Sequence, residues 1–259
     1  KWLKGKIYEV PLTKQNQYLP NLESIPVEIY QKTKIFLVNY PNSPTGAIAT
    51  KEFYVQLLKK AKQYGFLIVN DCVYGPLTYH TEPLSIFSIP DSENYCIEVH
   101  SLSKAFNMTG FRIGFMVANE KLMHILKEVK DNMDSGQYIP IQYAAMKAFE
   151  NESHTLPQLK EHYYRRLTQV AAILNKHHLY CKVPEATFYL YVQVPSTFKT
   201  AEDFALYLLY QAGIYTIPWD EAEPAVRFAM TYPIQTTEHD FLVELDRRLS
   251  RLSFFEKKE

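Results

Sequence analysis

Three short polar segments carry the side chains of this sequence that could do chemistry. Residues 39–46 end in Pro-Thr-Gly, residues 70–75 contain Asp71 and Tyr74, and residues 100–112 contain Lys104. A lysine can act as a nucleophile or a base, and an arginine, here Arg112, can hold an anion with a planar fork of N–H groups. Each segment alone is commonplace, since N-x-P-T-G is usually a turn. Their occurrence together, in this order, is much more specific.

The elements that would position these segments are short buried strands. Apolar runs at 35–38, 66–69 and 95–99 predict strands covered on both faces of a sheet. A helix lies between the first two, with Thr50 as N-cap and Gly65 just past its end. Strand, helix and strand predict a parallel sheet, in which ligands bind beyond the carboxyl ends of the strands. Each polar segment follows one of these strands.

The second half of the chain predicts a different arrangement. Two helices within 119–150 are broken near residues 135–136, and a longer helix covers 157–178, with Arg166 facing water. Predicted strands at 187–194, 214–217 and 226–230, with helices at 201–212 and 237–250, then suggest a small α+β domain. We therefore predict an N-terminally incomplete, cofactor-binding large domain over residues 1–150 and a small domain over residues 151–259.

Composition narrows the classes of function. The 259 residues include 28 Lys and Arg against 28 Asp and Glu, which argues against nucleic acid as a partner. The longest apolar runs are too short to span a membrane. Three scattered cysteines, Cys72, Cys96 and Cys181, suggest a reducing cytoplasm, and no spacing completes a metal site. With 8 glycines and no glycine-rich phosphate loop, a phosphate would need side-chain donors.

The runs N-Y-P-N-S-P-T-G, D-C-V-Y and H-S-L-S-K-A-F-N-M-T-G-F-R-I-G resemble the pyridoxal-phosphate-dependent aminotransferases of class I/II, fold type I. They are most similar to the branch of LL-diaminopimelate, aspartate and alanine aminotransferases. The resemblance implies an α/β fold: part of a large pyridoxal-phosphate-dependent transferase domain with a mostly parallel sheet, followed by the small α+β domain. It also implies transamination between an amino acid and a 2-oxo acid in a cytoplasmic homodimer.

The resemblance assigns roles residue by residue. Lys104 would bind the aldehyde of pyridoxal 5'-phosphate, Asp71 would hold the proton on the ring nitrogen, and Tyr74 would contact the ring oxygen. Arg112, Ser101 and Ser103 would hold the phosphate, with Asn42 and Ser43 close to the ring. Arg227, which lies in an apolar strand-like run, would bind the substrate carboxylate.

The sequence departs from the family pattern at three points. Ser43 stands where the family usually has asparagine, and Ala186 stands where it usually has glycine. Members also usually have a longer N-terminal part, so we expect the chain to lack strands and one wall of the site. Alternatives to transamination are a pyridoxal-phosphate carbon–sulfur β-lyase, and a truncated non-catalytic or regulatory aminotransferase-like domain.

Overall fold

The computed structural model describes residues 5–220, 223–233 and 237–253 of the chain. The described residues form two compact units. The second unit takes in Asn42–Gly46 and the residues from Gln158 onward, and the first takes in the rest. A division into domains after residue 150 stays a prediction. None of the helices in these ranges combines the length and hydropathy that crossing a bilayer requires.

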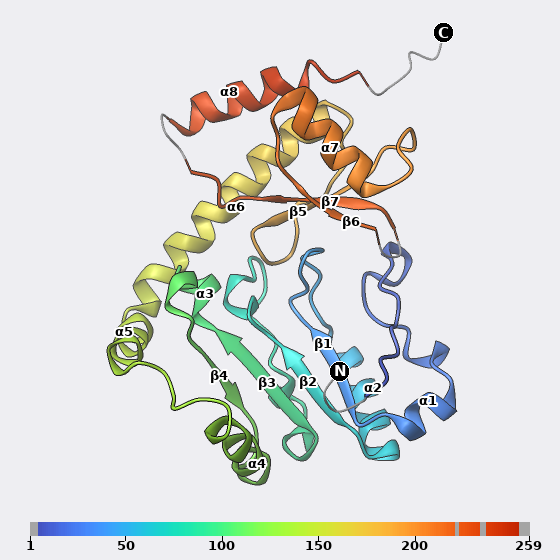
Figure 1. Cartoon of the computed structure of the whole chain (residues 1–259), viewed down its shortest axis with the longest axis vertical. Coiled ribbons are helices and arrows are strands. Elements are labelled where there is room, and N and C mark those ends of the chain that lie inside the picture. Colours follow the sequence, from blue (N-terminus) through green and yellow to red (C-terminus); the bar gives the residue numbers. More distant parts are fainter. Residues whose placement is uncertain (1–4, 221–222, 234–236, 254–259) are drawn as a thin grey trace. The chain divides into compact units, whose positions relative to one another are not determined.

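The first unit is built on a four-stranded sheet in the order β1-β2-β3-β4 (Figure 1). Its strands are β1 (Ile35–Asn39), β2 (Leu67–Asp71), β3 (Cys96–Ser101) and β4 (Gly114–Val117). The first three run parallel, as predicted, and β4 pairs antiparallel with β3. Strand β4 was not predicted, although its residues form a short apolar run, and all four of them are exposed. The fold class is therefore α/β with a mostly parallel sheet.

Helices complete this unit. They are α1 (Val27–Lys32), α2 (Lys51–Tyr64), α3 (Leu102–Ala105), α4 (Glu120–Asp131) and α5 (Ile139–Glu150). The predicted limits of α2 are confirmed. The Thr50 hydroxyl accepts a hydrogen bond from the Phe53 amide at 3.1 Å, and Gly65, with φ of 73°, donates its amide to the Ala61 carbonyl at 2.8 Å.

One face of α2 forms the core of the first unit. Its buried residues, Phe53, Tyr54, Leu57, Leu58 and Ala61, belong to the same cluster as the strand residues Val38, Ile68 and Cys96. The opposite face of the sheet is open at β1, where Ile35 is 61% and Leu37 67% exposed. The prediction that this strand is covered on both faces is therefore wrong for the described chain.

The second unit has a smaller antiparallel sheet in the order β5-β7-β6 (Figure 1). Its strands are β5 (Tyr189–Gln193), β6 (Ile217–Trp219) and β7 (Ala225–Ala229). The helices are α6 (Glu152–Lys176), which begins in the first unit, α7 (Ala201–Ala212) and α8 (Glu238–Leu249). The predicted α+β content is confirmed, although the strand predicted over 214–217 begins only at Ile217.

Helix α6 corrects two predictions. It begins at Glu152 rather than at residue 157, and the Asn151 carbonyl already accepts amides from His154 and Thr155. Arg166, predicted to face water, is buried. Its Nε donates to Glu238 Oε1 at 2.6 Å, and its Nη1 donates to the carbonyls of Met230 and Tyr232. Sequence periodicity could not reveal a partner 72 residues away.

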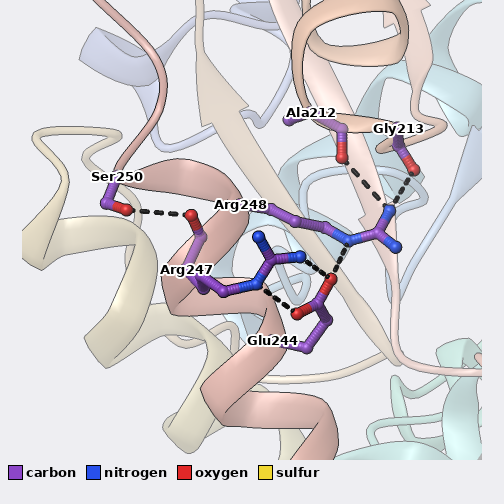
Figure 2. A network of polar contacts seen from close by, with 6 residues as sticks. All are labelled: Ala212, Gly213, Glu244, Arg247, Arg248 and Ser250. Carbon is purple, nitrogen blue, oxygen red and sulfur yellow. Dashed lines mark hydrogen bonds and ion pairs between the residues drawn. The ribbon is translucent and has the colours of Figure 1, made fainter.

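A polar network joins α8 to the end of α7 (Figure 2). Arg248 Nη1 donates to the carbonyls of Ala212 and Gly213, both at 3.1 Å, while its Nε donates to Glu244. Arg247 binds the same carboxylate. A guanidinium at the last carbonyls of a helix stabilises that end, because the carbonyls have no partners within the helix.

The loop after β1 contains a glycine that tolerates no side chain. Gly46 has φ of 73°, and a Cβ placed there would lie 2.2 Å from Pro184 Cβ and 2.8 Å from the Ala186 carbonyl oxygen. Asn42 closes this loop by accepting the Gly46 amide at its own carbonyl, at 2.8 Å. Residues 42–46 therefore pack against the segment 184–186, both within the second unit.

Candidate active site

The three predicted side chains Lys104, Tyr74 and Asp71 interact at the carboxyl ends of the parallel strands. Asp71 is the last residue of β2, and Tyr74 is buried three residues later. Lys104 lies in α3, directly after β3, and its Nζ is 5.6 Å from the centroid of the Tyr74 ring. This distance is within the range of a cation–π contact. The strand topology thus places the three functional groups in one region.

Asp71 carries the clearest electrostatic signature. Burial raises the pKa of its carboxyl above the ordinary value, opposed by a hydrogen bond from the Val73 backbone and by the charges of His100 and Lys104. Its Oδ1 is buried and has no hydrogen-bond partner among the described residues. A buried acceptor of this kind is costly unless a donor meets it. A protonated ring nitrogen is such a donor, so Asp71 fits the role that the resemblance assigns to it.

The predicted phosphate donors lie along one hydrogen-bonded segment. Ser101 caps α3 by accepting the Ser103 amide at 3.1 Å. The Thr109 hydroxyl donates to the Ser103 carbonyl at 2.9 Å, and Arg112 Nη1 donates to the Thr109 carbonyl at 3.1 Å. Arg112 is exposed, and its backbone adopts the left-handed conformation, with φ of 52°. Two hydroxyls, a capped turn and a guanidinium therefore share one short loop, a donor set suited to a dianion.

The remaining predicted residues belong to the second unit. Asn42 is buried, and its Oδ1 accepts the Thr45 hydroxyl at 2.6 Å, while Ser43 is half-buried. Arg227 lies on β7, between β5 and β6, and its Nε is buried without a hydrogen-bond partner among the described residues. The structure describes these three residues within their own unit, so their roles at the cofactor and substrate stay predictions.

The sequence does not predict a buried polar cluster on the core face of the first sheet, the face that packs against α2. The potential ligand atoms of Cys72, Glu98 and His100 all lie within 4.8 Å of one another. Glu98 is 2% exposed and accepts hydrogen bonds from the Ser85 hydroxyl and the Ile86 amide, both at 2.9 Å. The signal that could have revealed it is a single acidic residue within an apolar strand.

This cluster is explained as a structural network. Burial by itself raises the pKa of Glu98, but the hydrogen bonds from His100, Ile86 and Ser85 outweigh it, so the pKa lies below its ordinary value. Burial and the Glu98 carboxylate raise the pKa of the Cys72 thiol to about 12. The Glu98 carboxylate is thus satisfied by hydrogen bonds from within the unit, and these contacts account for the cluster as part of the packed structure.

Comparisons with known proteins show which family the chain resembles. A family model described as aminotransferase class I and II matches residues 1–239. The chain is 42% identical to an LL-diaminopimelate aminotransferase of Methanocaldococcus jannaschii over 96% of its length, and 33% identical to one of Syntrophobacter fumaroxidans, again over 96%. It spans 63% and 64% of these two relatives, which is less than two thirds.

Solved structures give the same result. The apo form of BacF from Bacillus subtilis superposes with a TM-score of 0.89 at 31% identity, covering 97% of this chain and 64% of that one. A probable N-succinyldiaminopimelate aminotransferase from Thermus thermophilus superposes with a TM-score of 0.82 at 26% identity, covering 93% and 64%. The fold of the described chain is therefore found in larger proteins.

Proposed function

The chain belongs to the class I and II aminotransferases, a pyridoxal-phosphate-dependent family, and from this premise we propose that it serves transamination between an amino acid and a 2-oxo acid. The observation that carries the proposal is the group formed by Lys104, Tyr74 and Asp71, whose Oδ1 has no hydrogen-bond partner in the described part of the chain. Membership of the family supports the reaction type, and the three side chains have the functional groups that this reaction needs.

The residues that would hold the cofactor follow from their functional groups. Lys104 would bind its aldehyde, Asp71 would accept the ring N–H at Oδ1, and the Tyr74 hydroxyl would donate to the ring oxygen. Ser101, Ser103 and Arg112 would hold the phosphate, with Asn42 and Ser43 beside the ring. When bound, pyridoxal phosphate supplies an electron sink for the pair left at the substrate Cα.

The protein's own part in the reaction is to bind and to move a proton. Arg227 would bind the substrate carboxylate through paired N–H groups. Lys104 Nζ, once released from the aldehyde, would take the proton from the substrate Cα and deliver it to C4′, the former aldehyde carbon of the cofactor. Asp71 would stay ionised when a cation lies against it, because an opposite charge offsets the burial that raises its pKa.

Substrate and assembly extend this proposal. LL-Diaminopimelate is the first amino donor to test, because the relatives named above carry it in their names. This would place the protein in amino-acid biosynthesis. We also propose a homodimer in the cytoplasm. Exposed apolar side chains on α5, among them Ile139 and Tyr143, support self-association, and three free cysteines are compatible with a reducing compartment.

Cofactor binding by the full chain tests the proposal. We expect added pyridoxal phosphate to give an absorbance band distinct from that of the free cofactor. Borohydride should then fix the cofactor on the peptide that contains Lys104. Lys104→Ala should abolish both signals, whereas Lys121→Ala, on exposed α4 surface, should leave them unchanged. A folded chain with no band, or with the cofactor fixed elsewhere, would contradict the proposal.

Turnover separates transamination from the lyase alternative. With LL-diaminopimelate and 2-oxoglutarate, the loaded protein should form glutamate. Pyruvate and ammonia released from a cysteine conjugate, without glutamate, would instead identify a carbon–sulfur lyase. The relatives named above are all aminotransferases, which favours the first outcome.

A further inference from the structure

Arg227 lies between two aromatic side chains on one face of the second sheet. In the register of the sheet, Arg227 pairs with Tyr191 of β5 and Ile217 of β6. Tyr189 and Trp219 lie two residues along these strands, so both share the face of Arg227. They approach it from strands on opposite sides of β7.

Both rings are close enough to hold the guanidinium. Arg227 Cζ lies 4.3 Å from the centroid of the Tyr189 ring and 5.9 Å from that of Trp219. A guanidinium over an aromatic face is stabilised within about 6 Å, more strongly where water is excluded. Tyr189 is only 7% exposed, so its ring has a fixed position in the unit.

The N–H groups of Arg227 differ from those of the neighbouring arginines. Arg166 is tied to Glu238 and to two carbonyls, and Arg248 to Glu244 and two carbonyls. Among the described residues, no carboxylate forms an ion pair with Arg227, and its buried Nε has no acceptor. Rings can stabilise the faces of a guanidinium but cannot satisfy its N–H edge. That edge therefore suits an external anion.

We propose that Tyr189 and Trp219 are positioning residues that fix the plane of the Arg227 guanidinium, so that its N–H edge meets a substrate carboxylate. This inference rests on the proposed function, which assigns the carboxylate to Arg227, and adds the two rings to the carboxylate site. Holding the plane before binding reduces the side-chain entropy lost on binding, so the rings contribute to affinity without touching the carboxylate themselves.

Carboxylate binding by the full chain tests the inference, with no cofactor required. Isothermal titration with 2-oxoglutarate would compare Tyr189→Leu and Trp219→Leu with Tyr189→Phe, which keeps the ring. We expect each leucine variant to weaken binding about five- to tenfold, and Tyr189→Phe less than about twofold. Tyr210→Leu, which removes a tyrosine that is 77% exposed on α7, is the matched control and should change nothing.

Spectroscopy gives a readout that a purely structural role would not move. The sequence has two tryptophans, so Trp2→Phe leaves Trp219 as the single reporter. Its emission should shift on adding 2-oxoglutarate, and Arg227→Lys should abolish the shift. In the unaltered chain, the Nε–H proton signal of Arg227 should lie upfield of those of exposed arginines, because of the ring currents.

The outcomes separate this inference from the proposed function. If the unaltered chain does not bind 2-oxoglutarate, the carboxylate site itself is wrong. If Arg227→Lys loses binding while folded leucine variants bind normally, the rings have no positioning role and the proposed function stands. Should the leucine variants melt below the assay temperature, the Arg227 Nε–H signal of the unaltered chain tests the inference instead. A chemical shift equal to that of the exposed arginines would overturn it.

Discussion

At the scale of single residues, Asp71 is destabilising in the chain without cofactor. Its carboxyl is desolvated, its pKa is raised, and its Oδ1 has no partner within the described ranges. A raised carboxyl pKa means that the folded state binds the proton more tightly than the unfolded state. The favourable contribution is complete below the unfolded pKa, and it is lost as the pH rises through the folded pKa. Asp71 therefore lowers the stability of the cofactor-free chain, and its proposed contact with the ring nitrogen explains why it is there.

Asp71→Asn should reveal this exchange. At pH 7 without cofactor, we expect the variant to melt at the same temperature as the unaltered chain or a few degrees above it, because the cost of desolvating an ionisable carboxyl has been removed. Pyridoxal phosphate should bind at least about tenfold more weakly, since the carboxylate no longer holds the ring proton.

Differential scanning calorimetry with and without the cofactor measures both effects. Asp134→Asn is the control, because that exposed carboxylate binds Lys130 rather than the site. Asp71→Asn melting several degrees lower without cofactor would contradict this account.

The sequence predicted Lys104, Asp71 and Tyr74 because each follows a strand end by a short, recognisable motif, and the structure brings the three together. It did not predict the contact of Arg227 with Trp219. That pair depends on the register of β6 with β7, which no local pattern records. Arg166 shows the same limit, because its partner Glu238 is remote in the sequence.

At the scale of elements, α7 depends on α8 for its C-terminal end. Arg248 satisfies the carbonyls of Ala212 and Gly213, and Glu244 orients its guanidinium. The hydrogen bonds from Arg247 and Arg248 lower the pKa of Glu244 to about 2, so this carboxylate stays ionised over the whole physiological range. The predicted helix limits were accurate, but the link between the two helices was not visible in them.

Arg248→Ala should destabilise the chain by about 1 kcal/mol, because two carbonyls at a helix end lose a charged donor. Arg247→Ala removes a guanidinium that binds the same carboxylate without reaching α7, so its effect on stability should be clearly smaller than that of Arg248→Ala. Urea unfolding followed by circular dichroism gives both values. Equal losses for the two variants would show that the carbonyl contacts contribute nothing.

At the scale of the whole molecule, the first unit has a packed core but also exposes many apolar side chains on β4, α4 and α5. No residue of α4 is buried and every residue of β4 is exposed. Tyr138, just before α5, is 72% exposed, and Ile139 and Tyr143 on α5 are each 64% exposed. Exposed apolar side chains in such number are typical of a surface that contacts other polypeptide. Helical periodicity in the sequence predicted these helices but could not indicate what covers their apolar side.

The double substitution Ile139→Lys with Tyr143→Lys should reduce self-association of the full chain. We expect sedimentation velocity to show a shift toward monomer, and the fluorescence of a bound apolar dye to fall by about half. Tyr210→Lys, at an exposed tyrosine on α7, should alter neither. An unchanged sedimentation profile would exclude this face of α5 from the assembly.

The contact of Gly46 with Pro184 and Ala186 has a consequence for how such chains can be recombined. The second unit is not a continuous stretch of sequence, because it includes Asn42–Gly46 from the first third of the chain. A chimera joined at residue 157 would receive the long C-terminal part from one parent and this small insert from the other. Only parents whose glycine and opposing backbone match would yield a folded hybrid, so a crossover there is constrained by five residues far upstream.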